Sequence, residues 1–169
     1  MREAVGRCIR CTKEVYCSDG FLHGIVLDSS HILCFTCREN DELIHILNQL
    51  LEAEKAGVET LDYLLRIYPS TVYEERMKDI KKDEAWSCSG LIEAVRREGG
   101  TPSKKTGTFL EKVKAQPSFE DKISLLNKGQ AWVARKINDA LSFGMHEETR
   151  SFLLEMKQRH VKNIQAMSV

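Results

Sequence analysis

The sequence predicts an all-α four-helix bundle that follows a small N-terminal module held together by cysteines. Three observations support this: paired cysteines open the chain, apolar residues recur at helical spacing from residue 41 onward, and only three prolines interrupt the 169 residues. An amphipathic helix must bury its apolar stripe against partners, so several long helices of this kind predict a bundle. The expected domains are a metal-stabilised module at 1–40 and the bundle at 41–169.

The N-terminal module contains two Cys-x-x-Cys pairs, formed by Cys8, Cys11, Cys34 and Cys37. Each pair places two thiolates on one side of a tight turn, and two pairs together make a tetrahedral sulfur site for Zn²⁺ or, less often, Fe. So short a segment cannot build a sufficient core by itself, and a metal ion would replace part of one. Apolar strands at 24–27 and 31–34, joined by a polar turn, predict the hairpin of a zinc ribbon.

Two alternatives to zinc stay open for these cysteines. Disulfides are one, although no signal peptide precedes the cysteines and we therefore expect a cytoplasmic protein with reduced thiols. Iron is the other, but Thr12 and Arg38 follow the pairs where rubredoxin-type sites usually carry glycine. Cys17 lies between the pairs as either a free loop thiol or a replacement ligand.

The rest of the chain predicts four long helices and one short one. Asn40 is a plausible first N-cap, Ser70 or Thr71 a second, and Ser118 with Asp121 resembles a capping box. Glycines at 99–100 end the second helix. The expected helices are 41–68, 72–98, a short 108–116, 119–142 and 146–167, and the long connection between the second and the fourth could run along the bundle.

Each long helix carries a polar residue where its apolar stripe demands an apolar one. Glu54, Glu84, Gln130 and His160 each lie seven residues from apolar stripe positions on both sides, so we expect all four to point into the bundle. Cys88 and Asn163 lie about one turn beyond Glu84 and His160.

Three interpretations of these buried polar groups stay open. They form a metal-free hydrogen-bonded network, or Glu54, Glu84 and His160 bind one Fe or Mn ion, or a residual two-metal site persists. Di-iron carboxylate bundles use a Glu, a Glu-x-x-His, a second Glu and a second Glu-x-x-His on their four helices. Only two of those four carboxylates are present here.

Several runs of sequence resemble an uncharacterised bacterial ferritin-like family over about residues 41–165. The resemblance rests on residues 51–57 (LEAEKAG), 82–88 (KDEAWSC), 99–103 (GGTPS), 106–109 (TGTF), 126–133 (LNKGQAWV) and the closing His160-x-x-Asn163-Ile164. It implies a ferritin-like fold and no particular reaction.

A thiolate metal site followed by such a bundle also resembles the layout of rubrerythrins, in which sulfur-bound iron passes electrons to a di-iron centre that reduces peroxide. The incomplete carboxylate set and the missing glycines depart from that pattern, so no catalytic residue is carried over.

Composition narrows the range of partners. The 25 basic and 25 acidic residues give a net charge of zero, which provides no global attraction for nucleic acids or acidic membranes. We therefore expect a metal-binding protein that acts as an interaction module, with a protein partner or a second copy of itself. A redox or oxygen-handling metalloenzyme that uses the bundle residues is the alternative.

Overall fold

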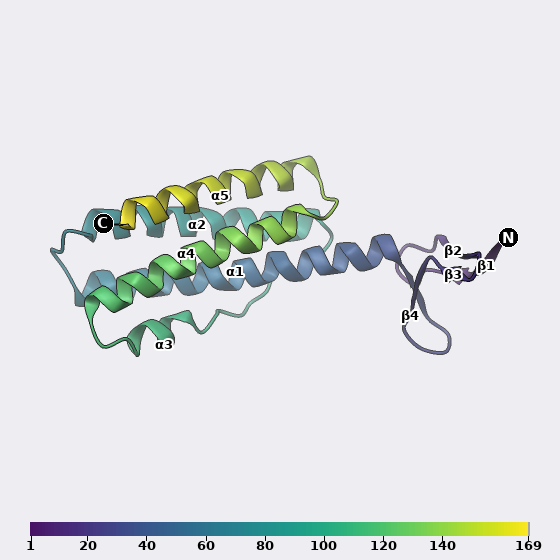
Figure 1. Cartoon of the computed structure of the whole chain (residues 1–169), viewed down its shortest axis with the longest axis horizontal. Coiled ribbons are helices and arrows are strands. Elements are labelled where there is room, and N and C mark those ends of the chain that lie inside the picture. The colour runs from purple at the N-terminus through teal and green to yellow at the C-terminus, as the bar shows by residue number, and fades with distance from the viewer. Residues whose placement is uncertain (169) are drawn as a thin grey trace. The chain divides into compact units, whose positions relative to one another are not determined.

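The computed structural model describes residues 1–168 and divides the chain into two compact units, Met1–Leu43 and a second unit that begins at Ile44 (Figure 1). The first unit contains all the strands, and the second is helical. No helix within the described residues is long and apolar enough to cross a membrane.

The first unit consists of two small antiparallel sheets. Their strands are β1 (Arg2–Arg7), β2 (Glu14–Ser18) and β3 (Phe21–Leu22) in one sheet, and β4 (Gly24–Val26) and β5 (Ile32–Cys34) in the other. The β4–β5 pair confirms the predicted hairpin, and the Asp28 carboxylate shapes its turn by accepting the Ser30 and His31 N–H groups at 2.9 and 3.0 Å. Strand β1 was not expected, because it is exposed along most of its length and shows no apolar alternation.

The helices confirm the predicted bundle. They are α1 (Phe35–Ile67), α2 (Glu74–Arg97), α3 (Phe109–Lys114), α4 (Phe119–Leu141) and α5 (Glu147–Met167). Within the second unit, α1, α2, α4 and α5 run side by side (Figure 1). Their apolar stripes meet in a buried cluster that includes Leu61, Leu64, Met77, Ile80 and Leu126.

Two of the predicted helix starts were wrong, and two other helix boundaries are confirmed. The first helix begins at Phe35, directly after β5, so Asn40 lies inside it and Cys37 lies in its first turn. Neither Ser70 nor Thr71 caps α2, which Tyr73 precedes. Ser118 accepts the Asp121 N–H at 3.0 Å as predicted, and Gly99, at φ +87°, ends α2.

The connection from α2 to α4 runs back along α1, as expected of the long crossover. Ser103 fixes it: its N–H donates to Asn48 Oδ1 at 2.7 Å, and its carbonyl accepts from Lys55 Nζ at 2.6 Å. Further along, the Gly107 N–H donates to the backbone carbonyl of Glu52 at 3.0 Å. This segment therefore lies along the face of α1 that carries Asn48, Glu52 and Lys55.

Candidate metal centres

The four paired cysteines converge in the first unit. The Sγ atoms of Cys8, Cys11, Cys34 and Cys37 all lie within 4.8 Å of one another. Cys8 and Cys11 come from the turn between β1 and β2, whereas Cys34 ends β5 and Cys37 follows in the first turn of α1. Among the described residues, no other group of three or more His, Cys, Asp or Glu side chains brings its ligand atoms so close together.

These thiols also form part of the small core of the first unit. Cys8 is buried with Val15 and Leu33, and the other three cysteines pack partly against them. All six cysteines of the chain are free thiols, and Cys17 lies on β2 outside the cluster. So thin an apolar core gains stability if the sulfur atoms bind a common ion.

Backbone N–H groups prepare the cluster for negative charge. Burial disfavours the Cys8 thiolate, but N–H groups of Cys11, Cys34 and Arg10 outweigh burial and lower the pKa of Cys8 to about 6. Burial, together with hydrogen bonds to the other three sulfur atoms, raises the pKa of Cys37 to about 12. One thiolate therefore forms readily, whereas full ionisation of the cluster calls for a cation.

The residue after the first pair carries backbone strain. Thr12 has φ +61°, in the left-handed region that glycine adopts freely and a β-branched residue rarely does. Its N–H donates to the Cys8 carbonyl at 2.9 Å, which closes the turn. Residue 12 thus has the backbone conformation that glycine favours at this position of rubredoxin-type sites, although it is a threonine.

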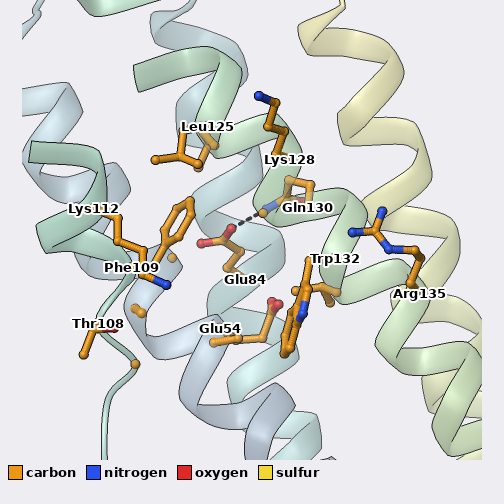
Figure 2. A pocket seen from close by; sticks show the side chains of 17 residues that line it. Glu54, Glu84, Thr108, Phe109, Lys112, Leu125, Lys128, Gln130, Trp132 and Arg135 are labelled. Atoms are coloured by element: carbon orange, nitrogen blue, oxygen red, sulfur yellow. Dashed lines mark hydrogen bonds between the residues drawn. The ribbon is translucent and has the colours of Figure 1, made fainter. Parts of the chain in front are cut away.

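The second candidate centre lies in the middle of the bundle. Glu54 on α1, Glu84 on α2, Gln130 on α4 and His160 on α5 are each no more than 3% exposed. The heptad spacing therefore predicted their inward orientation correctly. Figure 2 shows Glu54, Glu84 and Gln130 facing a common interior region.

Two hydrogen bonds fix the His160 ring. Its Nδ1 lies 2.9 Å from the Met156 carbonyl oxygen and its Nε2 lies 3.0 Å from Glu54 Oε1. Because a carbonyl only accepts, Nδ1 carries a proton and Nε2 is the atom that faces the carboxylate. Burial opposes a positive charge on the ring, but the Glu54 carboxylate outweighs burial and raises the pKa of His160.

Glu84 lies against bare backbone and accepts one hydrogen bond. Gln130 Nε2 donates to its Oε1 at 2.5 Å. A Cβ added at Gly57 on α1 would lie only 2.2 Å from Glu84 Oε2, so this glycine leaves the space that the carboxylate fills. Burial, followed by the nearby charge of Glu54, raises the pKa of Glu84 well above its ordinary value.

This buried group of side chains is incompletely satisfied. Glu54 Oε2, Glu84 Oε2, Gln130 Oε1 and Ser87 Oγ are buried and have no hydrogen-bond partner within the described residues. Buried polar atoms in native proteins are nearly always paired, and an ion or water commonly supplies the missing partner. Glu54 Oε2 and Gln130 Oε1 are acceptors without a donor, and Glu84 Oε2 becomes one once Glu84 loses its proton, which suits a bound cation.

Asn163 and Cys88, the residues one turn beyond His160 and Glu84, have different surroundings. Asn163 is buried, but its Nδ2 donates to Asp83 Oδ2 at 3.1 Å, and Arg159 also binds Asp83, at 2.8 Å. The Asn163 amide is therefore engaged with Asp83 on α2. Burial, then the charges of Glu54 and Glu84, raises the pKa of the half-buried Cys88 to about 12, which keeps it an inert thiol.

The donor set does not fit a pair of iron ions. Two carboxylates and one imidazole are present, while Gln130 occupies one further carboxylate position. Ser87 and Asn163 stand where Glu-x-x-His motifs would place histidines, and Asn163 is engaged with Asp83. The same residues offer the donor types of a single-ion site, because the Met156 carbonyl orients His160 and the glutamates have free oxygens, but their ligand atoms do not converge as the four thiols do.

Comparisons with known proteins agree with this architecture. Residues 41–168 match the family described as "Domain of unknown function (DUF6306)". The chain belongs to the DUF6306 family. No curated protein matches the chain.

One solved structure gives the DUF6306 chain its fold class. A ferritin-like, diiron-carboxylate protein from Bacillus anthracis strain Ames superposes with a TM-score of 0.60 at 15% sequence identity. The match covers 76% of this chain and 92% of that chain. The DUF6306 chain is therefore a ferritin-like four-helix bundle with a small N-terminal module of sheets and clustered cysteines.

Proposed function

We propose that this protein is a metal-binding protein whose N-terminal module holds a structural zinc ion. The observation that carries this proposal is the convergence of the Sγ atoms of Cys8, Cys11, Cys34 and Cys37 within 4.8 Å. Four thiolates fill the tetrahedral sphere that zinc prefers and leave no open position for a substrate. The ion would complete the small core formed by Cys8, Val15 and Leu33.

Metal analysis of the full chain tests the zinc site. Protein purified without added metal is expected to contain about one zinc ion per chain. Cys37→Ser should lose this zinc, while the control Cys17→Ser, in the same module but outside the cluster, should keep it. Zinc retained in Cys37→Ser would refute the assignment.

A second candidate function is supported by the unpartnered oxygens of the bundle. Glu54, Glu84 and His160 would hold a single Fe or Mn ion, with Gln130 beside it. Two carboxylates and one imidazole are the ligand types of mononuclear non-haem iron sites. Such an ion would supply redox or oxygen chemistry of the kind expected of a metalloenzyme.

The chain's own residues would prepare the bundle for this ion. The Met156 carbonyl holds the Nδ1 proton of His160 and thereby presents Nε2 toward Glu54. Gly57 leaves the space in which the Glu84 carboxylate lies, and Gln130 donates to one of its oxygens. The side chains of Glu54, Glu84 and His160 are buried, which keeps bulk water away from them.

Equilibrium dialysis against Fe²⁺ or Mn²⁺ under reducing conditions tests the bundle site. The zinc-loaded protein should take up about one further ion, and His160→Ala should abolish that uptake. His45→Ala, at an exposed position of α1, is the matched control and should bind like the unaltered protein. Uptake that does not depend on His160 would contradict the site. Binding of a protein partner or of a second copy of the chain stays a prediction.

A further inference from the structure

A cavity of about 380 Å³ opens beside the two buried glutamates. Residues of α1, α3, α4 and the segment before α3 line it, and Glu84 of α2 reaches into it (Figure 2). This volume falls in the range of pockets that hold small organic molecules.

The innermost part of the cavity is polar. Glu54, Glu84 and Gln130 line it, and Glu84 Oε2 and Gln130 Oε1 have no hydrogen-bond partner among the described residues. Both side chains are at least 97% buried, because Glu84 is 2% and Gln130 3% exposed. Two unpaired oxygens at the end of a cavity mark a place where a ligand or an ion can make hydrogen bonds or coordinate.

The walls of the cavity are mainly apolar. Phe109 on α3 lines it together with Leu125, Trp132 and Val133 on α4, and Gly129 lets the Phe109 ring approach α4 closely. A Cβ at Gly129 would lie 2.9 Å from the tip of that ring. These walls suit the hydrocarbon or aromatic part of a ligand.

Three cations surround the opening. Lys112 of α3 and Lys128 and Arg135 of α4 line the cavity and are exposed, and in Figure 2 they lie on three sides of the glutamates. None of the three has an ion pair within residues 1–168. By contrast, Lys114 on the same short helix pairs with Glu111 at 2.8 Å. Unpaired like charges around a hollow attract a counter-ion into it.

We propose that this cavity binds a small organic carboxylate whose apolar body lies against Phe109, Trp132 and Val133. The carboxylate stays at the opening, among Lys112, Lys128 and Arg135. The apolar body ends short of Glu84 and Gln130, so that a water molecule or an ion can still pair with their free oxygens. This inference extends the proposed function, because the inner end of the cavity is the proposed bundle metal site. The ligand is recognised by the cavity walls and the three cations, however, and its binding needs no ion.

Calorimetric titration of the full-length, zinc-loaded protein tests the proposal with octanoate and with 1-octanol, which has the same chain length and no charge. Octanoate should bind more tightly than 1-octanol. A charge-neutralised variant carries Lys112→Gln, Lys128→Gln and Arg135→Gln. This variant should bind octanoate about tenfold more weakly, since several exposed ion pairs are lost together, and should bind 1-octanol like the unaltered protein.

A matched control changes the net charge equally at exposed lysines that do not line the cavity. It carries Lys104→Gln, Lys105→Gln and Lys162→Gln and should bind both compounds like the unaltered protein. A second variant, Ala53→Phe, places a ring in the cavity from α1 and should abolish binding of both compounds. Circular dichroism confirms that each variant is folded.

The outcomes separate this proposal from the metal site. No octanoate binding, equal binding in the charge-neutralised variant, or full binding in Ala53→Phe would each overturn the carboxylate pocket. Metal content is measured on the same preparations. Octanoate binding that persists in a protein unable to take up Fe²⁺ or Mn²⁺ would count against the bundle metal site and leave the pocket standing.

Discussion

Glu84→Gln offers a direct test of the electrostatics in the bundle. Burial and the Glu54 charge raise the pKa of Glu84 well above the ordinary value of 4.5, and the hydrogen bond from Gln130 opposes this only in part. The folded protein therefore keeps a proton that the unfolded chain loses above pH 4.5. The stabilisation linked to this proton is fully present below the unfolded pKa and disappears as the pH rises toward the folded pKa.

The size of the effect follows from the linkage. Each pH unit between the two pKa values costs the unaltered protein about 1.4 kcal/mol of unfolding free energy, whereas a glutamine at residue 84 does not titrate. From about pH 5 upward the unaltered protein should therefore lose stability relative to Glu84→Gln until the pH reaches the folded pKa of Glu84.

Urea unfolding of zinc-loaded protein without iron or manganese, followed by far-UV circular dichroism, measures this difference. Glu93→Gln, at an exposed position of the same helix, is the control and should follow the unaltered protein at every pH. Parallel stability curves for the unaltered protein and Glu84→Gln over this range would refute the reasoning. Saturation with Fe²⁺ or Mn²⁺ should remove the difference in slope, because a ligating carboxylate stays ionised.

Three further substitutions test the packing and the turns. Thr12→Gly removes a strained φ of +61° and should stabilise the first unit by about 1 kcal/mol, measured as tighter zinc retention against a competing chelator. Gly90→Ala places a Cβ 2.0 Å from the Phe152 ring, and we expect a net loss of about 1 kcal/mol in urea unfolding, because overpacking exceeds the gain in helix propensity; a more stable variant would contradict this. Lys122→Met removes the buried ammonium that donates to the carbonyls of Val113, Lys114 and Gln116, and should cost about 2–3 kcal/mol by thermal unfolding, whereas an unchanged melting temperature would show that water replaces it.

The sequence predicted which residues face the inside of the bundle, because each polar residue that interrupts an apolar stripe lies seven residues from apolar members of that stripe. Glu54, Glu84, Gln130 and His160 could all be placed inside the bundle in this way, and their burial confirms it. Asn163, one turn beyond His160, is buried as well, but the spacing could not identify its partner. Asp83 precedes the buried Glu84 by one residue, so its bond to Asn163 depends on how two helices meet in space.

Local signals were less reliable where tertiary contacts decide the structure. The capping preference of Asn40 predicted a helix start there, yet α1 begins at Phe35, directly after β5. The exposed strand β1 has no apolar alternation and is held by its pairing with β2. Glycine positions gave no warning of their role: Gly57 lies in an ordinary helical stretch, and only the structure shows Glu84 filling the space beside it.

The cavity could not be foreseen from the sequence for a related reason. Lys112 and Arg135 belong to different helices and look like ordinary solvated charges. They share one opening only because the crossover is fixed along α1 through Ser103 and Gly107 and brings α3 against α4. No periodicity in the chain encodes that placement.

Anomalous diffraction from crystals soaked in Fe²⁺ or Mn²⁺ under reducing conditions tests the central claim most directly. The account predicts a zinc signal among the sulfur atoms of Cys8, Cys11, Cys34 and Cys37, and one separate iron or manganese signal between Glu54, Glu84 and His160. Zinc bound away from the four thiols, or a soaked bundle that shows no ion beside the unpaired glutamate oxygens, would contradict it.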